Sequence, residues 1–485
     1  MFQPLLWLVC QKNMVKKITT LHVLLVLLTS SVFAQEELDS LKQTQQQVIL
    51  EFGAFGAKDG ALPFWMKHNN SQRFTDLNAN ATYADVLYSG SHNAWGLLDV
   101  FWETEAVSTF APEGIYGSII QANAGIATGF IKLRVGMDEE FFGVNDTTLT
   151  VGNLSYGNNA RPLPKIVLAT NGWQRSPIFG NALSFQAYLA HGWFEKDRYQ
   201  SGALLHQKNF YLKGELLNKR LSLIAGVYHN AQWGGRNLDS ETAQPNGFKN
   251  YARIFLGGSG GGDALQTDQN NALGNHLGSY DLRAEYNFGL FTVANYWQFL
   301  WEDSSGLTPL NWRDGLVGVS VRLNKSNWVD RLLIEHVNTT HQDAHKTRKD
   351  GTSYIEPDNF MNNGVYQSGW SYNNDLIGSP MFLILNEESR SGSRVKNMID
   401  GLHVGLGGSA GIFDYQMRYT KFTNGGVFQE RIEPKLSVNA VDLRVLCKFS
   451  KSTQLSARFN YQDANFDSGK NFGVQLGFIK NFNLN

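Results

Sequence analysis

The sequence has little cysteine, no long apolar run after its first 34 residues, and no excess of charge of either sign. Of its two cysteines, Cys10 lies in a segment that we expect to be removed, so the mature chain cannot form a disulfide framework. No later apolar run approaches the roughly 20 residues of a membrane-spanning helix. The formal net charge of -1 leaves no dominant basic surface for DNA or RNA. These absences exclude a disulfide-rich domain, a helical membrane protein and a nucleic-acid partner.

Residues 1–34 have the pattern of an export signal. Lys16 and Lys17 precede the apolar run at 21–28, and Ala34 ends a stretch with the spacing of a signal-peptidase site. We therefore expect cleavage before residue 35, with Met14 as a second candidate for the start of the chain. Loss of the lysines in this segment moves the formal net charge to about -4.

Apolar and polar residues alternate in much of the remaining chain, as they do in a β-strand with two different faces. Clear examples are residues 131–137, 282–288, 441–449 and 455–462. We expect the polar faces to point into a hydrated interior, where their mixed charges mainly brace the strands. The charged residues expected to point inward are Lys132, Arg134, Arg283, Glu285, Asp442, Arg444, Lys448 and Arg458.

A soluble β-sandwich also alternates, so two further features favour a membrane barrel. Aromatic residues cluster near strand ends at 296–301 and 472–482, as in the girdles at two membrane interfaces. The chain also finishes in an alternating strand of the kind that closes outer-membrane barrels. At about ten residues a strand, the length predicts an all-β fold: a transmembrane antiparallel β-barrel of about 18 strands, over residues 49–485.

Several stretches lack the alternation that predicts a strand. Residues 287–290, "NFGL", predict a tight turn. Residues 256–278 and 338–374 are too long and polar for hairpin turns, so we expect external loops or segments folded into the lumen. Residues 61–74 include "LPFWMKHN", which has no periodicity, and we expect this element to pack against the barrel with Trp65 at an interface.

Several motifs, none of them decisive alone, occur together in an order typical of one family. They are "GNNARPLP" (157–164) after "RVGMDEEFFG" (134–143), "GVYHNAQWGG" (226–235), "WEDSSGLTP" (301–309), "IEHVNTT" (334–340), and "RKDG" followed by "YQSGW" (348–370). With them, the chain resembles the Wzi-type capsule assembly proteins over most of its mature length. The resemblance implies an outer-membrane barrel of a Gram-negative bacterium that acts as a lectin for capsular polysaccharide, with export machinery as a further partner.

The family also implies a lumen obstructed by folded loops and an N-terminal helical plug. Here only residues 35–48 stand between the expected cleavage site and the first strand, and 35–47 is the only stretch that favours a helix. We expect 35–48 to be a short periplasmic segment, too short for a bundle of helices. The lumen is then occluded by other loops, or partly open.

Carbohydrate sites combine carboxylates and amides, which bond sugar hydroxyls, with aromatic faces that stack on sugar rings. Residues 301–312 offer both kinds of group, and the candidates there are Trp301, Glu302, Asp303, Asn311 and Trp312. The alternative interpretation makes Trp301 a girdle residue and the acids solvated loop charges. In the later loop the candidates are Tyr366, Trp370 and Tyr372, whose alternative role is packing inside the mouth.

The sequence shows no motif for catalysis or for a cofactor. Glu335 and His336 adjoin on a predicted strand, so they point to opposite faces and cannot act as one acid–base pair. His341 and His345 could share a metal only on a helix, which this loop does not predict. We expect a non-enzymatic polysaccharide-binding barrel embedded in outer-membrane lipid. The alternatives are a substrate-specific outer-membrane channel for sugars or other small molecules, and a hydrolase assembled from distant strands.

Overall fold

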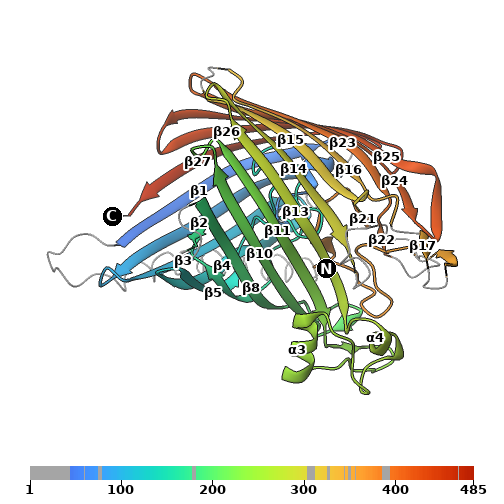
Figure 1. Ribbon diagram of the computed structural model, residues 1–485. Helices are drawn as coiled ribbons and strands as arrows, with labels where there is room; N and C mark the ends of the chain where they lie inside the picture. Colours follow the sequence, from blue (N-terminus) through green and yellow to red (C-terminus); the bar gives the residue numbers. More distant parts are fainter. Residues whose placement is uncertain are drawn as a thin grey trace, which may run out of the picture. The chain divides into compact units, whose positions relative to one another are not determined.

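The computed structural model describes residues 44–58, 60–74, 79–176, 182–302, 312–324, 328–342, 345–347, 351–355, 357–384, 394–467 and 469–484. These residues form a closed antiparallel β-barrel of 18 strands, which confirms the predicted fold class (Figure 1). β6 and β7 are two pieces of one barrel strand, because both pair with β8.

The barrel strands are β1 Thr44–Ala57, β2 Asn80–Ala94, β3 Leu98–Ala111, β4 Gly114–Thr128, β5 Ile131–Met137, β6 Lys165–Thr170, β7 Gln174–Arg175, β8 Leu183–Trp193, β10 Leu204–Leu216, β11 Leu221–Trp233, β13 Asn275–Asn287, β14 Phe291–Trp301, β15 Gly315–Leu323, β16 Arg331–Asn338, β23 Ile399–Ala410, β24 Phe413–Val427, β25 Glu430–Ser450, β26 Thr453–Ala464 and β27 Lys470–Asn483.

Shorter elements lie in the connections. They are α2 Phe64–Lys67, β9 Gln200–Ser201, β12 Arg236–Asn237, α3 Phe248–Leu256, α4 Gln266–Asn270, β17 His345–Thr347, β18 Ser353–Ile355, β19 Ser371–Tyr372, β20 Asp375–Leu376, β21 Leu383–Ile384 and β22 Val395–Lys396.

The first and last strands close the barrel. β1 pairs with β2 on one edge and with β27 on the other, from Gln47 opposite Asn483 to Ala57 opposite Gly473. The closing strand expected at the C-terminal end is therefore β27. β1 begins at Thr44, earlier than the boundary expected at residue 49.

The two faces of the barrel wall differ in polarity, as the alternation predicted. In β16, Leu332 and Ile334 are exposed, whereas Glu335 is fully buried on the opposite face. His336 again points outward, where its ring lies 3.0 Å from Asp400. The same exposed apolar face continues around the wall at Phe210, Leu212, Leu282, Val317, Val319, Met417, Leu455, Phe459 and Leu476. An apolar outer face with a polar interior is the pattern of a barrel in lipid.

The connections at the two ends of the barrel differ in length. Turns such as 95–97, 129–130 and 288–290 gather at one end, here called the short-turn end. The tight turn predicted at 287–290 is one of them. Connections such as 138–164 and 234–274 gather at the other end, here called the outer mouth. In outer-membrane barrels short turns face the periplasm and long loops face the outside.

The connection between β11 and β13 holds two helices: α4 lies within 256–278, where the sequence predicts a loop, and α3 precedes it. α3 occupies part of the 234–274 connection and ends at Gly257, which adopts the left-handed conformation with φ of 67°. Glycine takes this conformation without steric cost, and its N–H bonds to the carbonyls of Arg253 and Ile254, so the helix has a regular C-terminal cap. No helix in the described ranges has both the length and the apolar character needed to cross a membrane.

Candidate functional site

The connection 138–164 runs inside the barrel and is tied to several strands. Glu335 of β16 accepts hydrogen bonds from the hydroxyl of Thr150 at 2.6 Å and from the N–H of Val151 at 2.8 Å. Gln298 of β14 accepts the N–H of Leu154 at 2.8 Å. Glu140, at the start of the connection, accepts hydrogen bonds from Arg134 and Lys165 and one from Tyr188 at 2.6 Å. Buried hydrogen bonds thus tie this segment to β5, β6, β8, β14 and β16.

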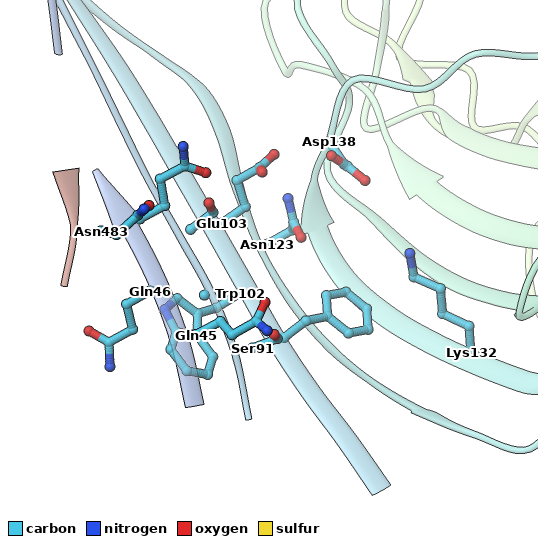
Figure 2. A pocket seen from close by; sticks show the side chains of 13 residues that line it. Gln45, Gln46, Ser91, Trp102, Glu103, Asn123, Lys132, Asp138 and Asn483 are labelled. Carbon is cyan, nitrogen blue, oxygen red and sulfur yellow. The ribbon is translucent and has the colours of Figure 1, made fainter. Parts of the chain in front are cut away.

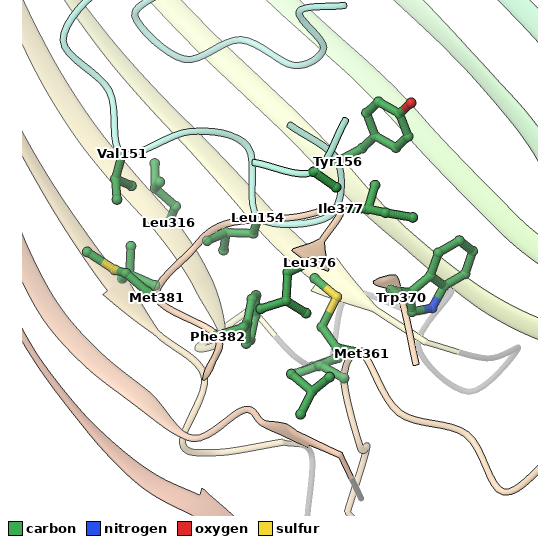
Figure 3. Close-up of a cluster of buried hydrophobic side chains, with 14 of the residues drawn as sticks. Val151, Leu154, Tyr156, Leu316, Met361, Trp370, Leu376, Ile377, Met381 and Phe382 are labelled. Carbon is green, nitrogen blue, oxygen red and sulfur yellow. The ribbon is translucent and has the colours of Figure 1, made fainter. Parts of the chain in front are cut away.

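A second segment, 357–384, packs against the first one. The N–H of Gly157 donates to the carbonyl of Ile377 at 2.7 Å, and that of Ala160 donates to the carbonyl of Leu376 at 2.9 Å. Fully or almost fully buried apolar side chains from both segments and from β15 form one cluster (Figure 3). Its labelled members are Val151, Leu154, Tyr156, Leu316, Met361, Trp370, Leu376, Ile377, Met381 and Phe382.

The segment 61–74 supplies a third insertion. Trp65 of α2 is completely buried, its indole N–H donates to Thr420 at 3.1 Å, and the guanidinium of Arg418 lies 4.2 Å from the ring centroid. The N–H of Phe64 donates to Gln462 at 2.8 Å. These partners lie on β24 and β26 and face the interior. The expectation that Trp65 lies at an interface is therefore wrong. Its indole N–H and its ring both contact residues on the inner face of the barrel wall.

Beside Trp65 lies a buried charge cluster centred on Asp442. Its carboxylate accepts hydrogen bonds from Arg418 at 3.0 Å, Arg444 at 3.1 Å and Arg458 at 2.6 Å. Asn460 donates to the same carboxylate at 2.6 Å. Three neighbouring strands are thereby bridged by one anion, which is the bracing role that the sequence predicted for inward-facing charges.

Arg73 fixes the end of the third insertion. It donates to Glu139 at 2.6 Å and to Glu105 of β3 at 2.7 Å. Burial by itself raises the pKa of Glu139, but the attraction of Arg73 and hydrogen bonds from Arg73 and Ser71 outweigh it, so the pKa lies below its ordinary value. The carboxylate is therefore stabilised in the folded state relative to its protonated form.

This lowered pKa predicts an acid dependence of stability. A depressed folded-state pKa contributes stability above the unfolded-state value of about 4.3, and the contribution disappears as the pH falls through the folded-state pKa. We expect Glu139→Gln to lower the free energy of unfolding at pH 7 and to reduce its loss on acidification. Urea unfolding between pH 7 and 3 measures both effects. Glu113→Gln, in the exposed turn between β3 and β4, is the control; an unchanged acid dependence in Glu139→Gln would contradict the assignment.

A polar cavity of about 510 Å³ opens along the inner faces of β1 to β5, toward the short-turn end (Figure 2). Glu103, Asn123 and Asp138 line one side of it, and Lys132 reaches in with its ammonium 4.5 Å from the ring centroid of Phe101. Within the part of the chain that the structure describes, no hydrogen bond joins the Glu103 carboxylate to another side chain. Carboxylate, amide, ammonium and an aromatic ring together suit a small polar ligand.

The predicted site residues do not gather in one open pocket. Trp301 lies on the outward face of β14, stacked on His229 with ring centroids 5.5 Å apart. Glu302 turns to the mouth and accepts the N–H of Asn359 at 2.7 Å. Trp312 is 54% exposed in the connection between β14 and β15 at the outer mouth, with its ring centroid 6.5 Å from that of Trp297. Asp303 and Asn311 lie outside the described residues.

The predicted site residues of the later loop, Tyr366, Trp370 and Tyr372, are buried in the interior of the barrel. Trp370 has no exposed surface, and Tyr366 and Tyr372 are almost as buried. The hydroxyl of Tyr366 donates to the carbonyl of Gly234 at 3.3 Å. These aromatic residues take the packing role that was their alternative interpretation, and in this structure their rings are not available to stack on a sugar.

Sequence reasoning missed the cavity and most of the tethers. Residues such as Gln47, Ser89 and Asn123 are ordinary polar positions in alternating strands, and only the pairing register of β1 to β4 aligns them in one cavity. The tether at Glu335 had a signal: its position placed it on the polar face of β16, opposite His336. Its partners Thr150 and Val151 lie far away in the chain, so no spacing could identify them.

Comparison with known proteins adds a family and a fold. A family model described as capsule assembly protein Wzi matches residues 44–383. Among solved structures, the chain is similar to Wzi of Escherichia coli, described as an outer-membrane protein involved in group 1 capsule assembly and as a carbohydrate-binding β-barrel. The identity is 13%, over 89% of this chain and 83% of that chain, with a TM-score of 0.58. At this identity the likeness shows the fold.

OprD of Pseudomonas aeruginosa is a more distant match, with 9% identity over 92% of this chain and 96% of that chain and a TM-score of 0.47. This similarity is too low to support an argument. No curated protein matches the chain significantly.

Proposed function

Because the chain belongs to the Wzi family of capsule assembly proteins, we propose that this outer-membrane barrel binds capsular or exported polysaccharide at the cell surface and helps to anchor it there. The barrel does so without turnover and with a lumen closed to solutes. Its partners are then the polymer, the surrounding lipid and, at the point of export, the polysaccharide export machinery.

The observation that supports this proposal best is the set of three inserted segments. Residues 61–74, 138–164 and 357–384 are tied to one another and to the inner wall by buried hydrogen bonds, ion pairs and a common apolar cluster. A packed interior obstructs the passage of solutes, which an open channel has to allow. A related barrel, Wzi of Escherichia coli, is itself described as carbohydrate-binding.

The segment 357–384 also builds a polar surface at the outer mouth. Gln72 donates to Asp375 at 2.6 Å, and Arg394 donates to the exposed Asn374 at 3.0 Å. Such amides, carboxylates and guanidinium groups can bond to sugar hydroxyls and uronate groups. Each contact is weak, but a polymer presents the same unit many times, so rebinding raises the overall affinity.

Two exposed tryptophans provide a matched test of where the polymer binds. Trp312 is 54% exposed at the outer mouth, and Trp328 is 71% exposed near the short-turn end. We predict that Trp312→Ala weakens retention of the host's own surface polysaccharide about tenfold, or about 1.4 kcal/mol, because an aromatic face is lost at the mouth. Trp328→Ala should leave retention unchanged. Glycan overlay with the refolded variants measures both; equal retention by the two variants would remove Trp312 from the site.

The polar cavity favours a second candidate function. A volume of about 510 Å³ lined by Glu103, Lys132 and amide side chains suits the binding vestibule of a substrate-specific channel for sugars or other small molecules. If the protein is such a channel, Glu103→Gln should change its ion conductance or the inhibition of that conductance by a ligand, while polysaccharide retention stays unchanged. The first candidate instead predicts no conductance in either protein.

A further inference from the structure

The helix α3 has an apolar side that nothing in the described chain covers. Phe248 is 86% exposed and Leu256 is 80% exposed, and with the exposed Ala252 they form a stripe at the spacing of successive helical turns. Phe255, which is 36% exposed, lies at the edge of this stripe. The buried residues Asn250 and Ile254 lie on the opposite side of the helix. α3 is therefore apolar on the side turned away from its own loop, which is the reverse of a helix that only packs on a protein core.

The helix rests on the outer wall of the barrel. Tyr251 packs against Trp233 with ring centroids 5.6 Å apart and against His206 at 5.5 Å, and Phe255 also contacts His206 at 5.4 Å. His206 and Trp233 belong to the outward faces of β10 and β11, the faces that carry the exposed apolar band further along the strands. Figure 1 shows α3 beside the outer-mouth ends of these strands.

Basic residues flank the stripe. Lys208, on the outward face of β10, donates to the carbonyl of Phe255, and its ammonium lies 4.2 Å from the ring centroid of that residue. Lys249 is exposed next to Phe248. Lysines and aromatic rings at the edge of an apolar surface are typical of groups at the boundary between lipid chains and headgroups, where anionic headgroups attract the ammonium.

We propose that α3 is an interfacial helix that inserts its apolar stripe into the outer leaflet of the membrane. The stripe is continuous with the lipid-facing wall of the barrel, so one lipid surface covers both. Amphipathic helices of this kind lie in the plane of the interface with the apolar side about 5–10 Å below the headgroup boundary. The 234–274 connection is thus attached to the membrane beside the mouth, a role independent of polysaccharide binding.

Spin labels test the insertion in the full-length barrel. Phe248→Cys and Leu256→Cys, each in a Cys447→Ala background, are labelled and reconstituted into vesicles of phosphatidylcholine with a fraction of phosphatidylglycerol. Oxygen dissolves in the lipid, whereas a nickel chelate stays in water. We expect both positions to be more accessible to oxygen than to the nickel chelate. Thr242→Cys, an exposed polar position in the same connection, is the control and should show the reverse order.

Two outcomes would overturn the proposal. Greater accessibility to the nickel chelate at 248 and 256 would place the stripe in water. Low accessibility to both reagents, together with spin–spin broadening between labels, would mean that a second copy of the chain covers it. Unlabelled Phe248→Ser/Leu256→Ser gives an independent check: hydrogen exchange of α3 in vesicles should become faster in this variant, while exchange of the barrel strands stays unchanged.

Discussion

Replacement of Asp442 by alanine is expected to destabilise the barrel by about 3–5 kcal/mol. The carboxylate has no exposed surface and holds Arg418, Arg444 and Arg458 together. Removing it leaves the buried guanidinium groups of Arg418 and Arg458 in the interior with no anion between them. The penalty comes from that uncompensated charge, so it exceeds the value of any single hydrogen bond in the cluster.

Equilibrium unfolding in urea measures this loss, and a second aspartate provides the control. Asp414 pairs with Lys448 near the short-turn end, where both side chains are about two-fifths exposed. Water and salt screen such a pair, so Asp414→Ala should cost no more than about 1 kcal/mol. A loss for Asp442→Ala as small as that for Asp414→Ala would show that water reaches the cluster and that it does not brace the wall.

Replacement of Trp65 by alanine should cost about 3–5 kcal/mol as well, for a different reason. The indole is completely buried, and its loss creates a cavity, removes the hydrogen bond to Thr420 and takes the aromatic face away from Arg418. Trp65 joins the inserted segment to β24 and β26. The substitution should therefore weaken mainly the contact between residues 61–74 and the barrel wall.

The free energy of unfolding and limited proteolysis of residues 61–74 together test this prediction. Trp65→Phe keeps most of the packing and should recover more than half of the lost stability. Trp95→Ala, in the turn between β2 and β3 where the ring is largely exposed, should change the stability by less than about 0.5 kcal/mol. Equal effects of the alanine substitutions at Trp65 and Trp95 would contradict the inserted position of the segment.

The barrel itself could be predicted because its signal is local. Alternation along a single strand, as in residues 131–137 or 441–449, fixes which side chains face lipid and which face the interior. Arg134 and Arg458 point inward as that alternation predicts, and in the interior they meet Glu140 and Asp442. The inward direction of these charges was therefore predictable, although their partners were not.

The positions of the aromatic candidates were harder to predict, because they depend on long-range packing. Trp301 and Glu302 looked like one site in sequence, yet adjacent residues at the end of a strand turn to opposite sides, one to His229 and the other to Asn359. Trp65 and Trp370 could have been interface or ligand-stacking residues. Their burial is decided by partners hundreds of residues away, which no local pattern reveals.

The helix α3 shows a different limit. In "FKNYARIFL" the polar residues Lys249, Asn250 and Arg253 share one side of the helix, and the apolar residues form one side that is wider than a single contact with a core needs. Such a wide apolar side is fully covered only when two apolar surfaces meet it, the barrel wall along one edge and lipid along the other. Neither surface is visible in the sequence of the connection itself.

The most direct test of the proposed function is single-channel conductance of the refolded barrel in a planar bilayer, with the host's surface polysaccharide added and retention of that polymer measured on the same preparation. A barrel that stays silent before and after addition, yet retains the polymer, is the result that we predict. Steady open conductance without the polymer would contradict the closed, polysaccharide-binding barrel and favour the channel.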